Sequence, residues 1–163
     1  MAQRLNPSFP SGRDVILRLS IVLLSLAGLA DSLYFTLAYY GRIRKARWVP
    51  EIFCAREGSS CVTVVRTPYA RVFGIPNSLL GIFYYAVLLV WIGFAPRHMN
   101  IAGQVFRPFE TVGLWLLGVS LLTVLLGFYL VYALRRVLGV HCPLCYTAHA
   151  INVALFVLLI LIS

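Results

Sequence analysis

The sequence contains few charged residues. Only 12% of its 163 residues are Asp, Glu, Lys or Arg, whereas 61% are hydrophobic. A soluble domain of this length would need far more charge to cover its surface. The mean hydropathy is +0.88, and the apolar residues form long runs rather than amphipathic stripes. The sequence also lacks internal repeats and low-complexity tracts, so we expect one small domain whose solvent is the lipid bilayer.

Acidic residues are scarce as well, with five Asp and Glu against 14 Lys and Arg and a net charge of +9. In a soluble protein this excess would suggest nucleic-acid binding. Here the basic residues fall almost entirely between the apolar runs, where contact with lipid headgroups and control of topology account for them. We therefore expect membrane lipid as a partner and no nucleic acid.

Four apolar runs are long enough to cross a hydrocarbon core about 30 Å thick, which requires about 20 helical residues. They cover approximately residues 15–40, 78–95, 109–134 and 143–162. The predicted fold class is therefore all-α and integral to the membrane: a four-transmembrane-helix bundle over residues 15–163, after a polar tail at residues 1–14. The last two connections are short, so neighbouring helices are predicted to pack antiparallel.

The connection at residues 41–77 is the only long one, and it contains Cys54 and Cys61. After Cys61 this segment is too apolar for a solvated loop, which predicts a short amphipathic half-helix lying across the mouth of the bundle as a lid. The small and polar residues between the two cysteines fit either a static disulfide or a mobile pair that shuttles electrons. The pair itself favours neither interpretation.

The second cysteine pair, Cys142 and Cys145, begins the last apolar run as Cys-Pro-Leu-Cys. Pro143 is favoured at the first helical position, so Cys142 is predicted at the N-cap, where backbone N–H groups and the helix dipole stabilise a thiolate. Cys145 lies on the same face about 4.5 Å deeper. Buried inert cysteines or half of a zinc site are the alternatives, but the spacing of Cys54 and Cys61 fits zinc poorly. We predict a redox pair and no metal.

The depth of this pair suggests its reaction partners. Cys142 is expected at the membrane boundary, within reach of a protein sulfur on the water side. Cys145 is expected within reach of a lipid-soluble acceptor on the bundle side. Quinones are lipid-soluble two-electron acceptors, which matches a dithiol–disulfide couple.

These residues together resemble the vitamin K epoxide reductase family in its prokaryotic form. The resemblance rests on Cys54 and Cys61, on the run TPYARVFGIPNSLLG at residues 67–81, and on the motif at residues 142–145. It implies a four-helix bundle around a quinone, with a quinone of the ubiquinone or menaquinone type as electron acceptor. It also implies that the loop pair is a shuttle, that vitamin K epoxide is a further substrate and that coumarin-type compounds inhibit.

The resemblance also implies roles for single residues. Cys54 would meet a thioredoxin-like partner, Cys61 would exchange with Cys142, and Cys145 would face the quinone. Asn77 and Thr67 correspond to family positions near the quinone. His149 stands where animal members have Tyr, one turn after Cys145, and we expect it to contact the quinone as well. Many bacterial relatives carry a fused thioredoxin-like domain; because this chain ends at Ser163, its partner is expected to be a separate protein.

Asp31 is the only acidic residue in the interior of a predicted span, since Glu110 lies at the very start of the third. Ionisable residues within a membrane are costly and are candidates for function. Its role is left open by the sequence. The competing interpretation of the whole chain is a non-enzymatic transporter or assembly factor with structural disulfides or a Cys-ligated metal.

The distribution of basic residues bears on membrane orientation. With four spans, both termini lie on one side and the cysteine pairs on the other. The side of the termini holds five basic residues: Arg4, Arg13, Arg18, Arg97 and Arg107. The cysteine side holds nine: Arg42, Arg44, Lys45, Arg47, Arg56, Arg66, Arg71, Arg135 and Arg136. The resemblance implies a prokaryotic cell membrane, and the positive-inside rule predicts that the cysteines face the cytoplasm, the reverse of most prokaryotic relatives. Intracellular disulfides are common mainly in hyperthermophiles.

Overall fold

Four long helices make up most of the described chain. The computed structural model describes residues 12–40, 42, 64, 67–72, 74–94, 107–139 and 141–162. The helices are α1 (Gly12–Tyr39), α4 (Asn77–Phe94), α5 (Arg107–Tyr132) and α6 (Pro143–Ile162). Each is long and apolar enough to cross a membrane, which confirms the predicted four-helix membrane fold.

The third span is longer than the sequence suggested. After Tyr132 the helix widens into a π-helical turn, Ala133–Val137, in which the N–H of Leu138 bonds the carbonyl of Ala133 at 3.0 Å. The membrane-crossing stretch therefore reaches Val137 rather than ending near residue 134. A π-helical turn often marks a functional site, and this one ends five residues before Cys142.

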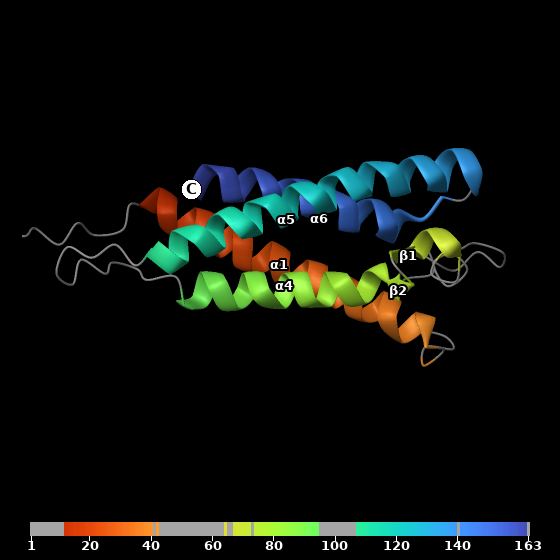
Figure 1. Cartoon of the computed structure of the whole chain (residues 1–163), viewed down its shortest axis with the longest axis horizontal. Helices are drawn as coiled ribbons and strands as arrows, with labels where there is room; N and C mark the ends of the chain where they lie inside the picture. The colour runs from red at the N-terminus through yellow and green to blue at the C-terminus, as the bar shows by residue number, and fades with distance from the viewer. Residues whose placement is uncertain are drawn as a thin grey trace, which may run out of the picture.

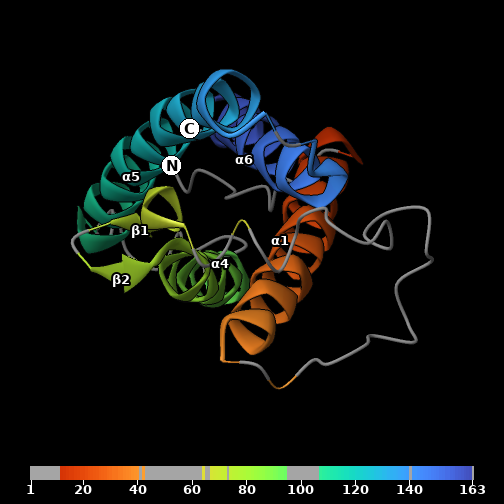
Figure 2. The ribbon, with the colours of Figure 1, turned by 90° about the vertical axis from the view of Figure 1, so that its right-hand side faces the viewer.

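The helices run antiparallel to their neighbours along the chain (Figure 1). α1 packs against α4 and α6, and α5 packs against α6. The start of α1 and the end of α6 lie at one end of the bundle, and Cys142 lies at the other. In the end view the helices form an arc in the order α4, α1, α6, α5 (Figure 2), so that α4 and α5 are its two arms.

Small residues bring α1 and α4 close together. A Cβ on Gly28 would overlap the Tyr85 ring, and a Cβ on Gly81 would meet the Ser32 hydroxyl oxygen at 2.5 Å. Apolar side chains gain little by leaving lipid for a helix interface, so membrane helices associate through such close packing of small residues. The α1–α4 seam is therefore fixed by glycine on both helices.

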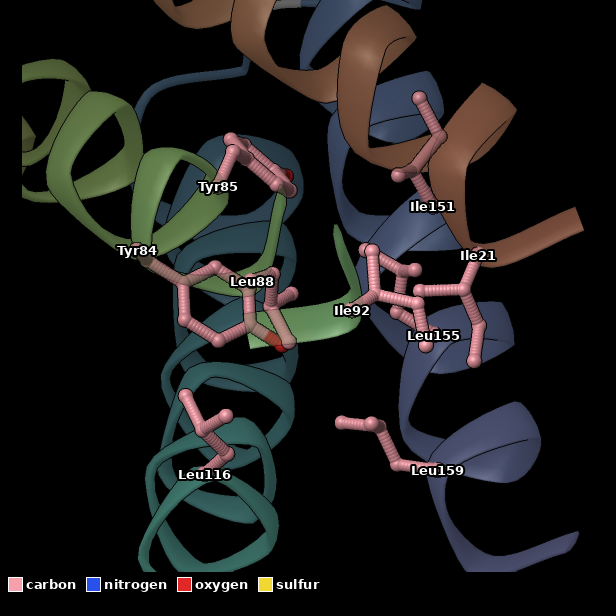
Figure 3. Close-up of a cluster of buried hydrophobic side chains, with 9 residues drawn as sticks. All are labelled: Ile21, Tyr84, Tyr85, Leu88, Ile92, Leu116, Ile151, Leu155 and Leu159. Atoms are coloured by element: carbon pink, nitrogen blue, oxygen red, sulfur yellow. The ribbon is translucent and has the colours of Figure 1, made fainter. Parts of the chain in front are cut away.

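A hydrophobic core fills the bundle toward the end where α1 begins and α6 ends (Figure 3). It consists of Ile21, Tyr84, Tyr85, Leu88, Ile92, Leu116, Ile151, Leu155 and Leu159. The two tyrosine hydroxyls are satisfied within the membrane span: Tyr84 donates to Ser120 Oγ at 2.8 Å and Tyr85 donates to Asn152 Oδ1 at 2.7 Å. A buried hydroxyl needs such a partner in an apolar medium.

The described part of the predicted lid contains short elements. A 3₁₀ turn, Pro68–Ala70, leads into two antiparallel strands, β1 (Arg71–Val72) and β2 (Ile75–Pro76). Pro68 and Pro76 lack the N–H that a continuous helix requires. The Arg71 guanidinium lies 5.5 Å from the centre of the Tyr39 ring and so connects the lid to α1. Residues 43–63, which include Cys54 and Cys61, lie outside the described residues.

Candidate functional site

Cys142 and Cys145 lie at the start of α6, as the sequence predicted. Pro143 is the first residue of the helix and Cys142 precedes it directly. The backbone N–H of Cys145 donates to Cys142 Sγ at 3.4 Å, so the sulfur occupies the position of an N-cap acceptor. The pair is in its dithiol form.

Local hydrogen bonds favour the thiolate of Cys142. The Cys145 thiol donates a hydrogen bond to the Cys142 sulfur, and this bond is the main cause that lowers the pKa of Cys142. The backbone N–H groups of Cys145 and Leu144 act in the same direction, whereas burial and the negative charge of Asp31 oppose it. The more outward cysteine of the pair is therefore the one that is prepared as a nucleophile.

Cys142 is nevertheless closed off from water, which corrects the expectation that it is within reach of a protein sulfur from the water side. Its exposed fraction is 0%. It packs in a small cluster with Phe35 and Ala38 of α1 and with Leu134 of the π-helical turn, and Val64 covers this cluster. The sequence could not show this burial because it depends on the end of α1 meeting the end of α5. Exchange at Cys142 requires this cluster to open.

Cys145 faces a different space. It lines a cavity of about 520 Å³ between the four helices and the lid, whereas Cys142 is not among the residues that line it. The walls of the cavity are mostly aliphatic and aromatic. The volume of the cavity falls within the range of small-molecule sites. The lining polar side chains include Asp31, Thr67, Asn77, Cys145, His149 and Asn152. All the described site residues predicted from the sequence, apart from Cys142, therefore border one cavity.

Asn77 and Thr67 enter this cavity from the lid side. Asn77 is the first residue of α4, directly after the buried Pro76, and its amide can donate to a ketone oxygen. Thr67 has a different local role, because its hydroxyl donates to the Val64 carbonyl at 2.7 Å. That hydroxyl proton holds the segment that covers Cys142 and is not directed at a ligand.

His149 lies on α6 one turn below Cys145, with its ring against α5. The ring fits beside Gly127, where a Cβ would come within 2.8 Å of Nδ1. Nδ1 is buried and has no hydrogen-bond partner among the described residues. Unsatisfied buried polar atoms are rare in native proteins and call for an explanation. A ligand oxygen in the cavity that His149 lines would supply the missing polar interaction.

Asn152 is a cavity residue that sequence reasoning missed. It follows Cys145 and His149 at helical spacing on the same face of α6, and it accepts the hydroxyl of Tyr85. Its spacing from Cys145 and His149 could have placed Asn152 on the same helix face from the sequence alone. The arrangement gives the cavity a polar strip along α6 and apolar walls elsewhere.

The cavity also reaches the outer surface of the bundle between α4 and α5. Phe83 of α4 and Leu122 of α5 both line it, yet they are 72% and 56% exposed on the outer surface of the bundle. In a membrane this surface faces lipid. The cavity that Cys145 lines is therefore bordered by lipid on this side.

Two further predictions concern the loop cysteines and metal binding. Cys54 and Cys61 lie outside the described residues, so their position relative to Cys142 stays a prediction. In the part of the chain that the structure describes, no group of three or more His, Cys, Asp or Glu side chains is placed to hold a metal ion.

Comparison with known proteins agrees with the site. The family model described as the vitamin K epoxide reductase family matches residues 19–160. This match spans all four helices and both cysteine pairs. No curated protein matches the chain.

Proposed function

The chain belongs to the vitamin K epoxide reductase family of membrane oxidoreductases, and we propose that it oxidises a protein dithiol and reduces a quinone. Members of this family generally use quinones as electron acceptors. The observation that carries the proposal is that Cys145 lines an apolar cavity open to lipid, while its partner Cys142 lies outside that cavity. The two sulfurs thus serve different reaction partners.

The proposed electron path has three exchanges. A thioredoxin-like protein reduces the loop pair at Cys54, and Cys61 passes the electrons on by attack on a Cys142–Cys145 disulfide at Cys142. The reduced pair then gives two electrons and two protons to the quinone, which leaves as hydroquinone. Each round creates one disulfide in the partner, so the function supported is protein disulfide formation.

The cavity suits a quinone of the ubiquinone or menaquinone type. Asn77 and His149 border it from α4 and α6, and each is suited to bond one of the two ring oxygens. The lateral opening beside Phe83 and Leu122 suits an isoprenoid tail. Vitamin K epoxide and coumarin-type inhibitors present a similar flat ring with oxygen substituents, and we include both as ligands of this site.

A single substitution tests the proposal. Purified protein is reduced, mixed anaerobically with a short-tailed quinone, and followed by the absorbance of the hydroquinone. Cys145→Ala is expected to abolish quinone reduction by any dithiol, because the substitution removes the only sulfur among the described residues that line the cavity. The matched control is Val153→Ala, an exposed residue on the same helix, which should keep wild-type turnover. Normal turnover in Cys145→Ala would remove the mechanism.

Metal analysis of the same preparation separates this proposal from a structural role. A transporter or assembly factor with Cys-ligated metal predicts stoichiometric metal and no redox change with quinone. The proposed enzyme predicts hydroquinone formation that is unaffected by a chelator.

We also propose that the cysteine end faces the cytoplasm. The support is the excess of basic residues on that side, nine against five. The enzyme would then form disulfides in cytoplasmic proteins. A tag at the N-terminus, probed with a membrane-impermeant reagent on intact cells, decides the orientation: an accessible tag agrees with the proposal, and a cytoplasmic N-terminus rules it out.

A further inference from the structure

Asp31 is a titratable group in the cavity that the electron path does not use. It lies in the second half of α1 and lines the same cavity as Cys145 and His149. No cation pairs with it among the residues that the structure describes. A carboxylate is costly within a membrane span, so its presence in the same cavity as the redox sulfur needs a reason.

The chemistry at Cys145 supplies a reason. Oxidation of the Cys142–Cys145 dithiol to a disulfide releases two electrons and two protons, and reduction of a quinone to a hydroquinone consumes two electrons and two protons. The Cys145 thiol proton is engaged with Cys142, and the walls of the cavity contributed by α5 are entirely without titratable side chains. A titratable group elsewhere in the cavity wall is therefore placed to carry the protons from sulfur to oxygen.

We propose that Asp31 is the general acid–base of quinone reduction: its carboxylate accepts a thiol proton of the cysteine pair and the resulting acid gives that proton to a quinone oxygen. The carboxyl group ends each transfer in its starting state, so protons and electrons balance without any further reactant. The inference rests on the proposed function and adds to it the residue that moves the protons.

Other titratable groups face the same space. They are Tyr69 from the lid, Tyr84 and Tyr85 from α4, and Cys145 and His149 from α6. Tyr84 and Tyr85 have their hydroxyl protons committed to Ser120 and Asn152. His149 has one ring nitrogen packed against α5. Asp31 is the only carboxyl group among the described cavity residues, and its charge is felt at Cys142.

Asp31→Asn tests the inference, because the amide keeps the shape and a hydrogen-bond donor but carries no transferable proton at pH 7. The rate of quinone reduction by the prereduced protein should fall by at least about 100-fold, the usual contribution of general acid–base catalysis. The KM for the quinone should stay close to wild type. Exchange of the Cys142–Cys145 disulfide with dithiothreitol, which needs no quinone, should persist.

Three comparisons keep the result specific. Asp14→Asn removes an acid from the first turn of the same helix, away from the cavity, and should react at the wild-type rate. Asp31→Glu should recover most of the rate, and added formate should partly restore Asp31→Ala. The pH profile of wild type should have one titration limb that Asp31→Asn lacks.

The outcomes separate the two proposals. If wild type reduces quinone and Asp31→Asn does so equally fast, the role of Asp31 is refuted while the proposed function stands. If Asp31→Asn loses disulfide exchange and thermal stability together with quinone reduction, and formate restores nothing in Asp31→Ala, Asp31 is structural and the inference fails. If wild type reduces no quinone, the proposed function itself fails.

Discussion

Removing the thiol of Cys145 should raise the pKa of Cys142, because the Cys145 thiol donates the hydrogen bond that contributes most to lowering it. A hydrogen bond to a charged group is worth about 1.5–3 kcal/mol, and one pKa unit corresponds to about 1.4 kcal/mol. In Cys145→Ala the midpoint of the Cys142 titration should therefore move to higher pH. The backbone N–H groups of Cys145 and Leu144 stay in place, so part of the stabilisation persists.

The measurement is the ultraviolet absorbance of the thiolate as a function of pH, in protein that also carries Cys54→Ala and Cys61→Ala so that a single thiol titrates. Cys145→Ser is the matched control, since its hydroxyl can still donate to the sulfur and should keep most of the effect. An unchanged midpoint in Cys145→Ala would refute the assignment of the lowered pKa to that hydrogen bond.

Three further predictions concern packing and binding. Gly28→Ala forces a methyl group into the Tyr85 ring and should lower the stability of the protein by about 1–3 kcal/mol, measured by thermal unfolding in detergent. The control Gly118→Ala, with open space around the added methyl group, should not lower the stability. Equal Tm values for the two variants would contradict the close packing. A double-mutant cycle of Tyr84→Phe and Ser120→Ala should give a coupling of about 0.6 kcal/mol, and zero coupling would mean that their hydrogen bond does not form. Asn77→Ala should raise the KM for quinone about tenfold, the equivalent of one hydrogen bond; an unchanged KM would place the quinone elsewhere.

The sequence predicted the family and the four-helix membrane fold, and both are confirmed. Long apolar runs and the Cys-Pro-Leu-Cys motif are local features of the sequence, so they can be recognised without knowledge of the fold. The same holds for the N-cap position of Cys142, which follows from Pro143 alone. The placement of Asn77 and His149 on one cavity with Cys145 agrees with the resemblance, while their roles stay predictions.

Other features depend on how distant segments meet, and the sequence could not supply them. The burial of Cys142 arises where Phe35 of α1 meets Leu134 of the π-helical turn. The position of the His149 ring depends on the space left by Gly127 in the neighbouring helix. The engagement of the Thr67 hydroxyl by Val64 depends on the fold of the lid. Each is a tertiary contact with no periodic signature along the chain.

The two sulfurs at the start of α6 have opposite surroundings, and this difference separates their reaction partners. A water-soluble reagent meets neither Cys145, which looks into oil, nor Cys142 until its cover is lifted, and a lipid-soluble oxidant inside the cavity does not touch Cys142. In the proposed function, electrons therefore pass between the aqueous and membrane sides through the bond that joins the two sulfurs. Such an arrangement would prevent water-soluble thiols from reducing the quinone directly.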